Sequence, residues 1–325
     1  MNLASTRFGI TMGDPCGIGP EIIIKALEVK PSYINKCIVF GSYDLLIKYS
    51  NMLDSKIPIC KIASPDQAEE EKINVIDPCP IDISTLPVGN VCKEGGDCAF
   101  KYVKCAIDAA LDKKISSVVT APLNKEALHM AGHNYAGHTA IFGEFTHGTS
   151  YAMLLWSEKL KTIHASTHVS LLNACKNLNV QREIDVITLA HDTLVKTGYE
   201  NPRIAVAGLN PHAGENGLFG DEEIREIIPA VEKCRDKGIN VQGPIAPDTV
   251  FLRALKGEYD IVVAQYHDQG HIPLKLLAFD NGVNITVGLD VLRTSVDHGT
   301  AFDIAGKLIA KPDSLLYAIE IGEKL

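Results

Sequence analysis

Three histidines of the sequence each follow a short apolar run and lie beside glycine or acidic residues. They are His168 in "STHVSL", His212 in "LNPHAGENG" and His267 in "YHDQGH". In a parallel α/β sheet, residues just past the carboxyl ends of strands line the ligand crevice, so three imidazoles there can converge on one divalent ion. Any one of them alone is better explained as a structural histidine, but the recurrence favours a metal site. Three histidine ligands leave positions open for substrate, which is typical of a catalytic metal.

A second set of residues has the chemistry to hold a phosphate and a carboxylate. An arginine offers a fixed fork of donors and a lysine a mobile point charge, and the two together suit these anions. Taken singly, each residue of the set would more often be an ordinary surface residue. The set comprises His138 and Thr139 in "AGHTAIFGE", Lys275 in "IPLKLL", Asn284 in "GVNIT" and Arg293 in "LRTS".

Two glycine-containing loops could contact a nucleotide. The stretch "ITMGDPCGIGPEI" leaves an apolar run, turns through Gly13, Asp14 and Gly19, and enters a predicted helix at Pro20. It predicts either a tight structural turn or a loop whose N–H groups approach a ligand, and it does not fit the G-x-G-x-x-G fingerprint of the Rossmann fold. The loop "VDHGTAFDIAGK" offers Asp297, His298, Thr300 and Asp303 to a ribose or an adenine, although turn chemistry alone explains Gly299.

The elements that position these loops read as alternating strands and helices. This alternation predicts mostly parallel sheets covered by helices on both faces, in one or two α/β lobes. Short apolar runs predict strands at Phe8–Thr11, Cys37–Phe40, Val118–Thr120, Ile204–Ala207 and Ile261–Ala264. Pro or acidic residues in a first turn predict helices at Pro20–Leu27, Asp97–Leu111 and Asp221–Arg235, and the apolar residues Leu315, Leu316 and Ile319 predict a last helix packed into the core.

Composition narrows the class of protein. The chain has 325 residues, 46% hydrophobic and 22% charged, with 40 acidic and 31 basic residues and a net charge of -9. This balance argues against nucleic acid and anionic lipid as partners, and no apolar stretch approaches the roughly 20 residues of a membrane span. Nine cysteines without a C-x-x-C pair fit a reducing cytoplasm, and Cys16 is interpreted as a small neutral filler. The acidic run Glu69–Glu71 is interpreted as a solvated face.

Taken together, the motifs resemble a known family. The opening "GDPCGIGPE" and the closing "DHGTAFDIAGK" are similar to the isocitrate and isopropylmalate dehydrogenase superfamily. The segments "GHTAIFGEFT", "STH", "GLNPHAGENG", "PDT", "YHDQGH", "GVNIT" and "RTSVDHGTA" resemble, in order and over essentially the whole chain, the 4-hydroxythreonine-4-phosphate dehydrogenase family. The segments "HASTHVSLLNA" and "DQGHIPLKLL" look closer to the branch that acts on D-threonate or D-erythronate 4-phosphate than to the branch of pyridoxal phosphate (vitamin B6) biosynthesis.

The resemblance implies two α/β/α lobes with mostly parallel sheets and an active site in the cleft between them. The expected cofactor-side domain spans residues 1–128 plus 282–325, and the expected metal, substrate and dimerisation domain spans residues 129–281. It also implies a homodimer with shared sites, in which His168 and His212 of one subunit and His267 of the other hold the divalent ion. Zinc, cobalt and magnesium are all candidates, and imidazole favours the first two.

The implied reaction is the oxidation and decarboxylation of a 4-phosphorylated four-carbon hydroxy acid with NAD, or with NADP as a second possibility. The phosphate-capable set would hold the substrate, and the two glycine-containing loops would hold the cofactor. Asp248 in "APDT" and Asp268 beside His267 are the candidate catalytic carboxylates, either as substrate contacts or as partners of a ligand imidazole. The alternative substrate is 4-hydroxy-L-threonine 4-phosphate. Two other classes stay open on fold alone: a metal-binding sensor of a phosphorylated metabolite, and a phosphate acetyltransferase.

Overall fold

In a computed structural model, which describes residues 7–146, 150–278 and 282–325, the chain divides into two α/β units. Unit 1 comprises Met1–Gly148 with Leu289–Glu323, and unit 2 comprises Thr149–Gly288 with Lys324–Leu325. The chain therefore changes unit near residues 148 and 288, whereas the sequence expectation had placed these changes near 128 and 281. The assignment of cofactor and metal roles to the two lobes stays a prediction. None of the described helices is long and apolar enough to cross a membrane.

Unit 1 is built on a parallel six-stranded sheet in the order β3-β4-β2-β1-β5-β12. Its strands are β1 (Phe8–Thr11), β2 (Cys37–Phe40), β3 (Ile59–Lys61), β4 (Ile73–Ile76), β5 (Ser117–Thr120) and β12 (Leu292–Val296). Its helices are α1 (Gly19–Val29), α2 (Tyr43–Met52), α3 (Lys93–Leu111), α4 (Lys125–Met130), α5 (His138–Phe145) and α11 (Asp313–Lys324), with 3-10 segments at Pro31–Lys36 and Pro65–Gln67.

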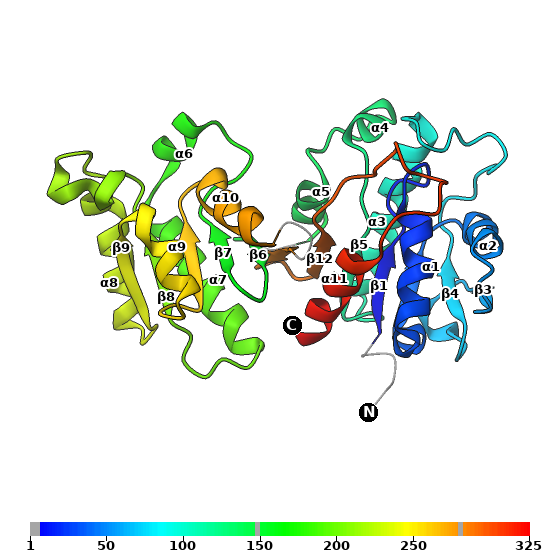
Figure 1. Cartoon of the computed structure of the whole chain (residues 1–325), viewed down its shortest axis with the longest axis horizontal. Coiled ribbons are helices and arrows are strands. Elements are labelled where there is room, and N and C mark those ends of the chain that lie inside the picture. Colours follow the sequence, from blue (N-terminus) through cyan, green and yellow to red (C-terminus); the bar gives the residue numbers. More distant parts are fainter. Residues whose placement is uncertain (1–6, 147–149, 279–281) are drawn as a thin grey trace. The chain divides into compact units, whose positions relative to one another are not determined.

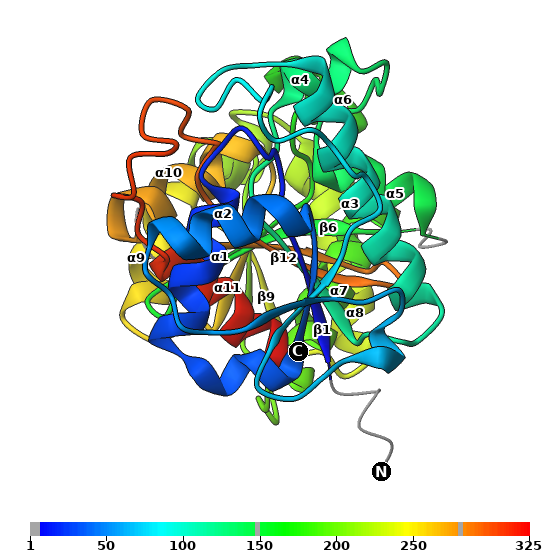
Figure 2. The same cartoon turned by 90° about the vertical axis from the view of Figure 1, so that its right-hand side faces the viewer.

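Helices cover both faces of this sheet (Figures 1 and 2). Helices α1, α2 and α11 lie on one face, and α3 and α5 lie on the other. Every residue of β1, β2, β4 and β5 is buried, as expected of parallel strands that are packed on both sides. Helix α1 begins where Pro20 needs no N–H partner, and the carboxylate of Glu21 in its first turn bonds Lys25 and the backbone N–H of Ala310.

Unit 2 has a mixed sheet in the order β11-β6-β7-β10-β8-β9. Its strands are β6 (Ala152–Trp156), β7 (Lys161–His164), β8 (Ile204–Ala207), β9 (Val241–Ile245), β10 (Ile261–Ala264) and β11 (Val283–Val287). Strands β7, β10, β8 and β9 are parallel, and β6 is antiparallel to both β7 and β11. Because β7, β10 and β8 are adjacent and parallel, the loops that follow them leave the same edge of the sheet.

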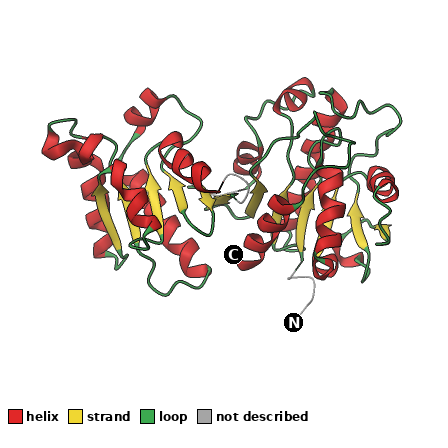
Figure 3. Ribbon diagram, in the orientation of Figure 1, coloured by secondary structure: helices red, strands yellow, loops and turns green. Residues whose placement is uncertain are grey.

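The helices of unit 2 also lie on both faces of its sheet, as Figures 2 and 3 show, with α9 and α10 on one side and α7 and α8 on the other. They are α6 (Leu171–Asn177), α7 (Val180–Lys196), α8 (Ile228–Asp236), α9 (Pro247–Leu255) and α10 (His267–Ala278), with a 3-10 segment at Pro211–Gly217 and a π-helical turn at Glu223–Ile227. The core between α9, α10 and the sheet contains Leu155, Ala205, Val250, Val262 and Leu274.

The predicted α/β alternation is confirmed. Four predicted strands coincide with β1, β2, β8 and β10, and Val118–Thr120 lies within β5. Helices α1 and α3 contain the predicted Pro20–Leu27 and Asp97–Leu111, and α11 carries the predicted last helix. The predicted single helix Asp221–Arg235 is wrong in one respect, because its first part is a π-helical turn and α8 begins only at Ile228. Pro229 has no N–H and cannot continue an α-helical hydrogen-bond ladder from the preceding turn.

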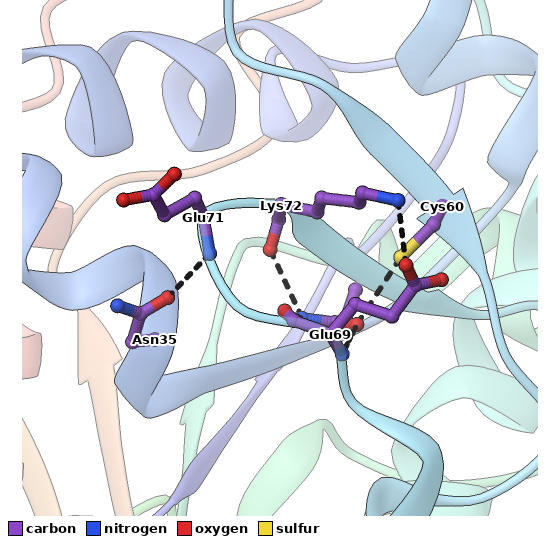
Figure 4. Close-up of polar contacts among 6 residues, drawn as sticks. Asn35, Cys60, Glu69, Glu71 and Lys72 are labelled. Carbon is purple, nitrogen blue, oxygen red and sulfur yellow. Dashed lines mark hydrogen bonds and ion pairs between the residues drawn. The ribbon is translucent and has the colours of Figure 1, made fainter.

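The acidic run Glu69–Glu71 forms the turn before β4, and all three residues are exposed, as predicted (Figure 4). The Glu69 carboxylate pairs with Lys72, and the backbone N–H of Glu71 donates to the Asn35 side chain at 2.7 Å. Below the turn, the amide of buried Asn74 donates to two backbone carbonyls and accepts from the Glu69 N–H and the Cys60 thiol. These bonds are structural, and all nine cysteines of the chain are free thiols.

Candidate active site

Two of the three predicted metal ligands lie together at the edge of the unit 2 sheet. His168 is in the loop after β7, and His267 is the first residue of α10, directly after β10. Their ring centroids are 5.7 Å apart and the rings are tilted by 41°. His267 Nδ1 lies 2.7 Å from the Asp268 carboxylate, which can only accept, so Nδ1 carries the ring proton and Nε2 presents its lone pair. Asp268 therefore pairs with His267, whose role as a metal ligand stays a prediction.

The third predicted ligand, His212, lies in an unusual stretch of backbone. Its own φ is 51°, and the residues that follow it, from Ala213 to Asn216, all have positive φ as well. His168 also has a positive φ of 51°. Left-handed non-glycine residues are uncommon, and such strain persists only where surrounding contacts enforce it. Here the Glu223 carboxylate accepts from the backbone and the side-chain amide of Asn210, two residues before His212.

Within one chain, His168 lies beside His267. The expected sharing of the ion, by His168 and His212 of one subunit and His267 of the other, stays a prediction. The aromatic neighbour of His212 is Phe219, with ring centroids 6.2 Å apart. Across the described part of the chain, no group of three or more His, Cys, Asp or Glu side chains is arranged to hold a metal ion. An imidazole nitrogen whose tautomer is fixed by a carboxylate suits zinc or cobalt better than magnesium.

Two buried histidines lie next to His267, one stacked on its ring and the other bonded to the first. His271 stacks on His267 with ring centroids 3.6 Å apart, and its Nδ1 lies 2.9 Å from the His267 carbonyl and 3.1 Å from His164 Nε2. His164 Nδ1 in turn lies 3.1 Å from the carbonyl of Met153, which fixes the proton on that nitrogen. Burial lowers the pKa of His164 to about 3 and, together with His267, lowers the pKa of His271 to about 4. His271 belongs to α10, one turn after His267.

Three of the predicted substrate-binding residues lie close together in unit 1. His138 and Thr139 are the first two residues of α5, and Arg293 lies on β12. The Arg293 guanidinium donates to the hydroxyls of Thr139 at 3.3 Å and Thr120 at 3.2 Å, and burial lowers its pKa to about 9, so it stays cationic at neutral pH. Burial and the nearby charge of Arg293 lower the pKa of His138 well below its usual range. A cation beside a helix N-terminus and a hydroxyl suits an anion.

The other two predicted substrate residues belong to unit 2. Lys275 lies on α10, near enough to His271 for its positive charge to lower the pKa of that histidine. Asn284 lies on β11, and its side-chain oxygen is buried without a hydrogen-bond donor among the described residues. The side-chain Nε2 of His138 in unit 1 is likewise buried without a described partner. Unsatisfied buried polar atoms are rare in proteins, so these two atoms are candidates for ligand contacts.

The glycine turn predicted to contact a cofactor is tightly packed. A Cβ on Gly13, which has φ +71°, would lie 2.2 Å from the Pro122 carbonyl oxygen, and a Cβ on Gly19 would lie 1.9 Å from the Met12 carbonyl oxygen. Asp14 is fully buried, accepts from the backbone N–H of Cys16, and has its pKa raised to about 6 by burial. Packing explains the two glycines, whereas Asp14 Oδ2 is buried without a hydrogen-bond partner among the described residues, and the cofactor role of this turn stays a prediction. Buried Cys16, with its pKa raised, is a neutral filler as predicted.

The remaining predicted residues are more accessible. The loop after β12 packs on the glycine turn through Thr300, whose carbonyl accepts from the Ile18 N–H at 3.1 Å, while His298 is half-buried and Asp303 is exposed. His298 and Asp303 thus remain the better-placed candidates for a cofactor contact in unit 1. Asp248 is exposed in the first turn of α9, the helix that packs against the 3-10 segment of His212.

Comparison with known proteins identifies the family. The family model of the pyridoxal phosphate biosynthetic protein PdxA matches residues 33–322. D-threonate 4-phosphate dehydrogenase of Salmonella typhimurium is 49% identical over 323 residues, covering 97% of this chain and 98% of that protein. 4-Hydroxythreonine-4-phosphate dehydrogenase of Beijerinckia indica is 44% identical, covering 97% of this chain and 94% of that protein.

Solved structures agree with this relationship. The crystal structure of 4-hydroxythreonine-4-phosphate dehydrogenase from Klebsiella pneumoniae superposes with a TM-score of 0.85 at 50% identity, covering 98% of both chains. Isocitrate dehydrogenase from Methylococcus capsulatus superposes with a TM-score of 0.51 at 13% identity, which shows a shared fold only. The chain therefore has the isocitrate dehydrogenase-like α/β fold and belongs to the PdxA family of dehydrogenases, oxidoreductases that act on a CH–OH group.

Proposed function

We propose that this enzyme oxidises and decarboxylates D-threonate or D-erythronate 4-phosphate, with NAD as the hydride acceptor and one divalent cation per site. Oxidation at C3 gives a β-keto acid, and loss of carbon dioxide then gives dihydroxyacetone phosphate. The observation that carries the proposal is the 49% identity, over nearly the whole of both chains, to D-threonate 4-phosphate dehydrogenase of Salmonella typhimurium. NADP is the second candidate for the cofactor.

The second candidate substrate is 4-hydroxy-L-threonine 4-phosphate, which has an amino group at C2 and would give 3-amino-2-oxopropyl phosphate. It is supported by the 44% identity to the Beijerinckia enzyme of that name and by the family match. The higher identity to the D-threonate 4-phosphate dehydrogenase of Salmonella typhimurium, 49% against 44%, favours the hydroxy acid.

We propose that His168 and His267 of one chain bind the divalent cation and that His212 of a partner subunit completes the site. Three observations support this pairing: the 5.7 Å separation of the first two rings, the Asp268 carboxylate that fixes the proton of His267 on Nδ1, and the lack of a third convergent ligand among the described residues. A divalent cation held there supplies Lewis-acid chemistry, which favours loss of a hydroxyl proton and later of carbon dioxide.

The other side chains bind and orient the substrate. Arg293 and Thr139 are proposed to hold the phosphate or the carboxylate, because a buried guanidinium with a hydroxyl at a helix N-terminus binds anions strongly. His138 is neutral at physiological pH, so its buried Nε2 can accept or donate one hydrogen bond according to its tautomer. Lys275 and Asn284 are proposed as the contacts from unit 2, and Asp248 as a second carboxylate near the His212 segment.

NADH formation tests the proposal. The purified protein should reduce NAD when given D-threonate or D-erythronate 4-phosphate with zinc, cobalt or magnesium, and a chelator should abolish the signal. A coupled assay should find dihydroxyacetone phosphate in equal amount to NADH. The proposal is wrong if none of these metals supports NADH formation with either acid, or if NADH forms without dihydroxyacetone phosphate.

A further inference from the structure

The three histidine loops of unit 2 leave adjacent strands, and buried amides join the backbones of these loops. Gln265 lies between β10 and α10, two residues before His267, and is 2% exposed. Its side-chain Nε2 donates to the carbonyl of Ala207 at the end of β8, at 2.9 Å. The backbone carbonyl of Gln265 accepts a hydrogen bond from the hydroxyl of Ser166, in the loop after β7, at 2.9 Å. One residue thus joins the loops that carry His168, His212 and His267.

Gln269 makes the second connection. It lies two residues after His267 on α10, and its Nε2 donates to the carbonyl of Gly208 at 2.8 Å, four residues before His212. Its Oε1 accepts from the backbone N–H of Gln265 at 2.7 Å. Both polar ends of the amide are therefore used, which fixes its orientation. Because the side chain is 9% exposed, water is a poor substitute for either bond.

Glu183 of α7 closes the network from the opposite face of the sheet. Its Oε2 accepts from Gln265 Nε2 at 3.3 Å, and it is fully buried. The neighbouring Arg182 donates to the carbonyls of Ala165 at 2.8 Å and Tyr151 at 3.0 Å, so it holds the backbone at the end of β7. The network connects backbone atoms rather than imidazoles, and it therefore sets the positions of the loops and not their chemistry.

We infer that Gln265 and Gln269 are positioning residues that set the spacing of the His168, His212 and His267 loops and thereby the affinity and geometry of the metal site. This inference rests on the proposed metal-dependent function. A metal centre tolerates only small errors in ligand position, so supporting hydrogen bonds matter nearly as much as the ligands. The left-handed residues His168 and His212 need such support, since a positive φ is uncommon for any residue other than glycine.

The test uses Gln269→Leu, which removes both bonds of the amide while keeping a similar volume. The full-length protein is stripped of metal and titrated with Co²⁺, whose visible absorption spectrum reports the geometry of its ligands. We expect the Co²⁺ dissociation constant to rise about tenfold or more, the range found when supporting hydrogen bonds of metal ligands are removed, and the spectrum of the loaded protein to change. If Gln269→Leu does not fold, Gln269→Glu replaces it, because it keeps the side-chain volume and places an oxygen against the Gly208 carbonyl.

Asn74→Leu is the matched control. It removes a buried amide of unit 1 that also bonds backbone carbonyls, so it should cost comparable or greater stability while leaving the Co²⁺ affinity and spectrum unchanged. If wild-type protein fails to bind Co²⁺, the proposed function fails and this inference with it. If wild-type protein binds Co²⁺ and Gln269→Leu matches it in affinity and spectrum, the positioning role alone is wrong. An equal loss of affinity in Asn74→Leu would also overturn it, as a general effect of destabilisation.

Discussion

Replacing Glu183 by glutamine should make unit 2 more stable at neutral and alkaline pH and leave its stability unchanged near pH 4. The wild-type carboxyl is fully buried on α7, and burial raises its pKa from 4.5 to about 7 in spite of the bond from Gln265 and the charge of Arg182. Its Oε1 and the Oε1 of Gln265 are both buried without a donor among the described residues. A glutamine at this position has nearly the same shape and carries no charge, and its N–H₂ group takes the place of one carboxylate oxygen.

The size of the effect follows from linkage. In the pH range between 4.5 and about 7 the folded state keeps a proton that the unfolded state releases, so the free energy of unfolding of the wild type falls as the pH rises through this window. A shift of this size corresponds to about 3 kcal/mol at most, at roughly 1.4 kcal/mol per pH unit. The amide of the Glu183→Gln variant has no proton to lose, so the variant should keep this stability at pH 8.

Unfolding in denaturant at pH 4 to 8, followed by tryptophan fluorescence, measures this directly. The single tryptophan, Trp156, lies on β6 of unit 2 and is 7% exposed, so its signal reports the unit that contains Glu183. Glu232→Gln, the same change at an exposed position of α8, is the control and should follow the wild-type pH dependence. Parallel curves for Glu183→Gln and wild type across this range would show that the buried carboxyl does not carry the raised pKa.

The remaining predictions concern metal and substrate. Each of the substitutions His168→Ala, His212→Ala and His267→Ala should remove bound metal and nearly all turnover, as measured by metal analysis and NADH assays. A variant with full metal occupancy and normal turnover would exclude its residue from the metal site. A hybrid dimer of His168→Ala and His212→Ala subunits should regain activity, because one of its two sites carries both substitutions and the other carries none. A hybrid of His168→Ala and His267→Ala should stay inactive, because each site carries one substitution. The reverse pattern would place His267 at the partner's metal. Arg293→Met should lower kcat/KM by roughly 10- to 150-fold, the loss of a hydrogen bond to a charged group, with Thr139→Val less affected; an unchanged kcat/KM would remove Arg293 from the substrate site.

Local patterns in the sequence predicted much of the fold. Buried strands of a parallel sheet are short continuous apolar runs, so β1, β2, β8 and β10 could be placed from sequence. The same reasoning placed His168, His212 and His267 at strand ends, and their loops do leave one edge of the sheet because β7, β10 and β8 are adjacent. The π-helical turn before α8 was missed, although Pro229 is a signal that a regular helix cannot run through this position.

The supporting residues of the site could not be predicted in the same way. Gln265, Gln269, Glu183 and His164 contact residues between 4 and 107 positions away in the chain, and a polar residue on a helix or at a strand end shows no sign of such partners in the sequence. The glycine turn could be placed from its motif, but the reason for its glycines could not. The close approach of Gly13 to Pro122 and of Gly19 to Met12 is seen only in the folded chain.

The specificity of this dehydrogenase for a 2-hydroxy acid phosphate is measured by comparing kcat/KM for the 2-hydroxy and the 2-amino substrate at identical NAD, metal and pH. A hydroxyl and an ammonium group at C2 differ by a full charge, and a poorly paired polar group in a desolvated site commonly costs more than the roughly 1.4 kcal/mol that a tenfold ratio requires. We predict that D-threonate or D-erythronate 4-phosphate exceeds 4-hydroxy-L-threonine 4-phosphate by at least about tenfold. An equal or reversed ratio would contradict the proposed specificity and assign the enzyme to pyridoxal phosphate synthesis.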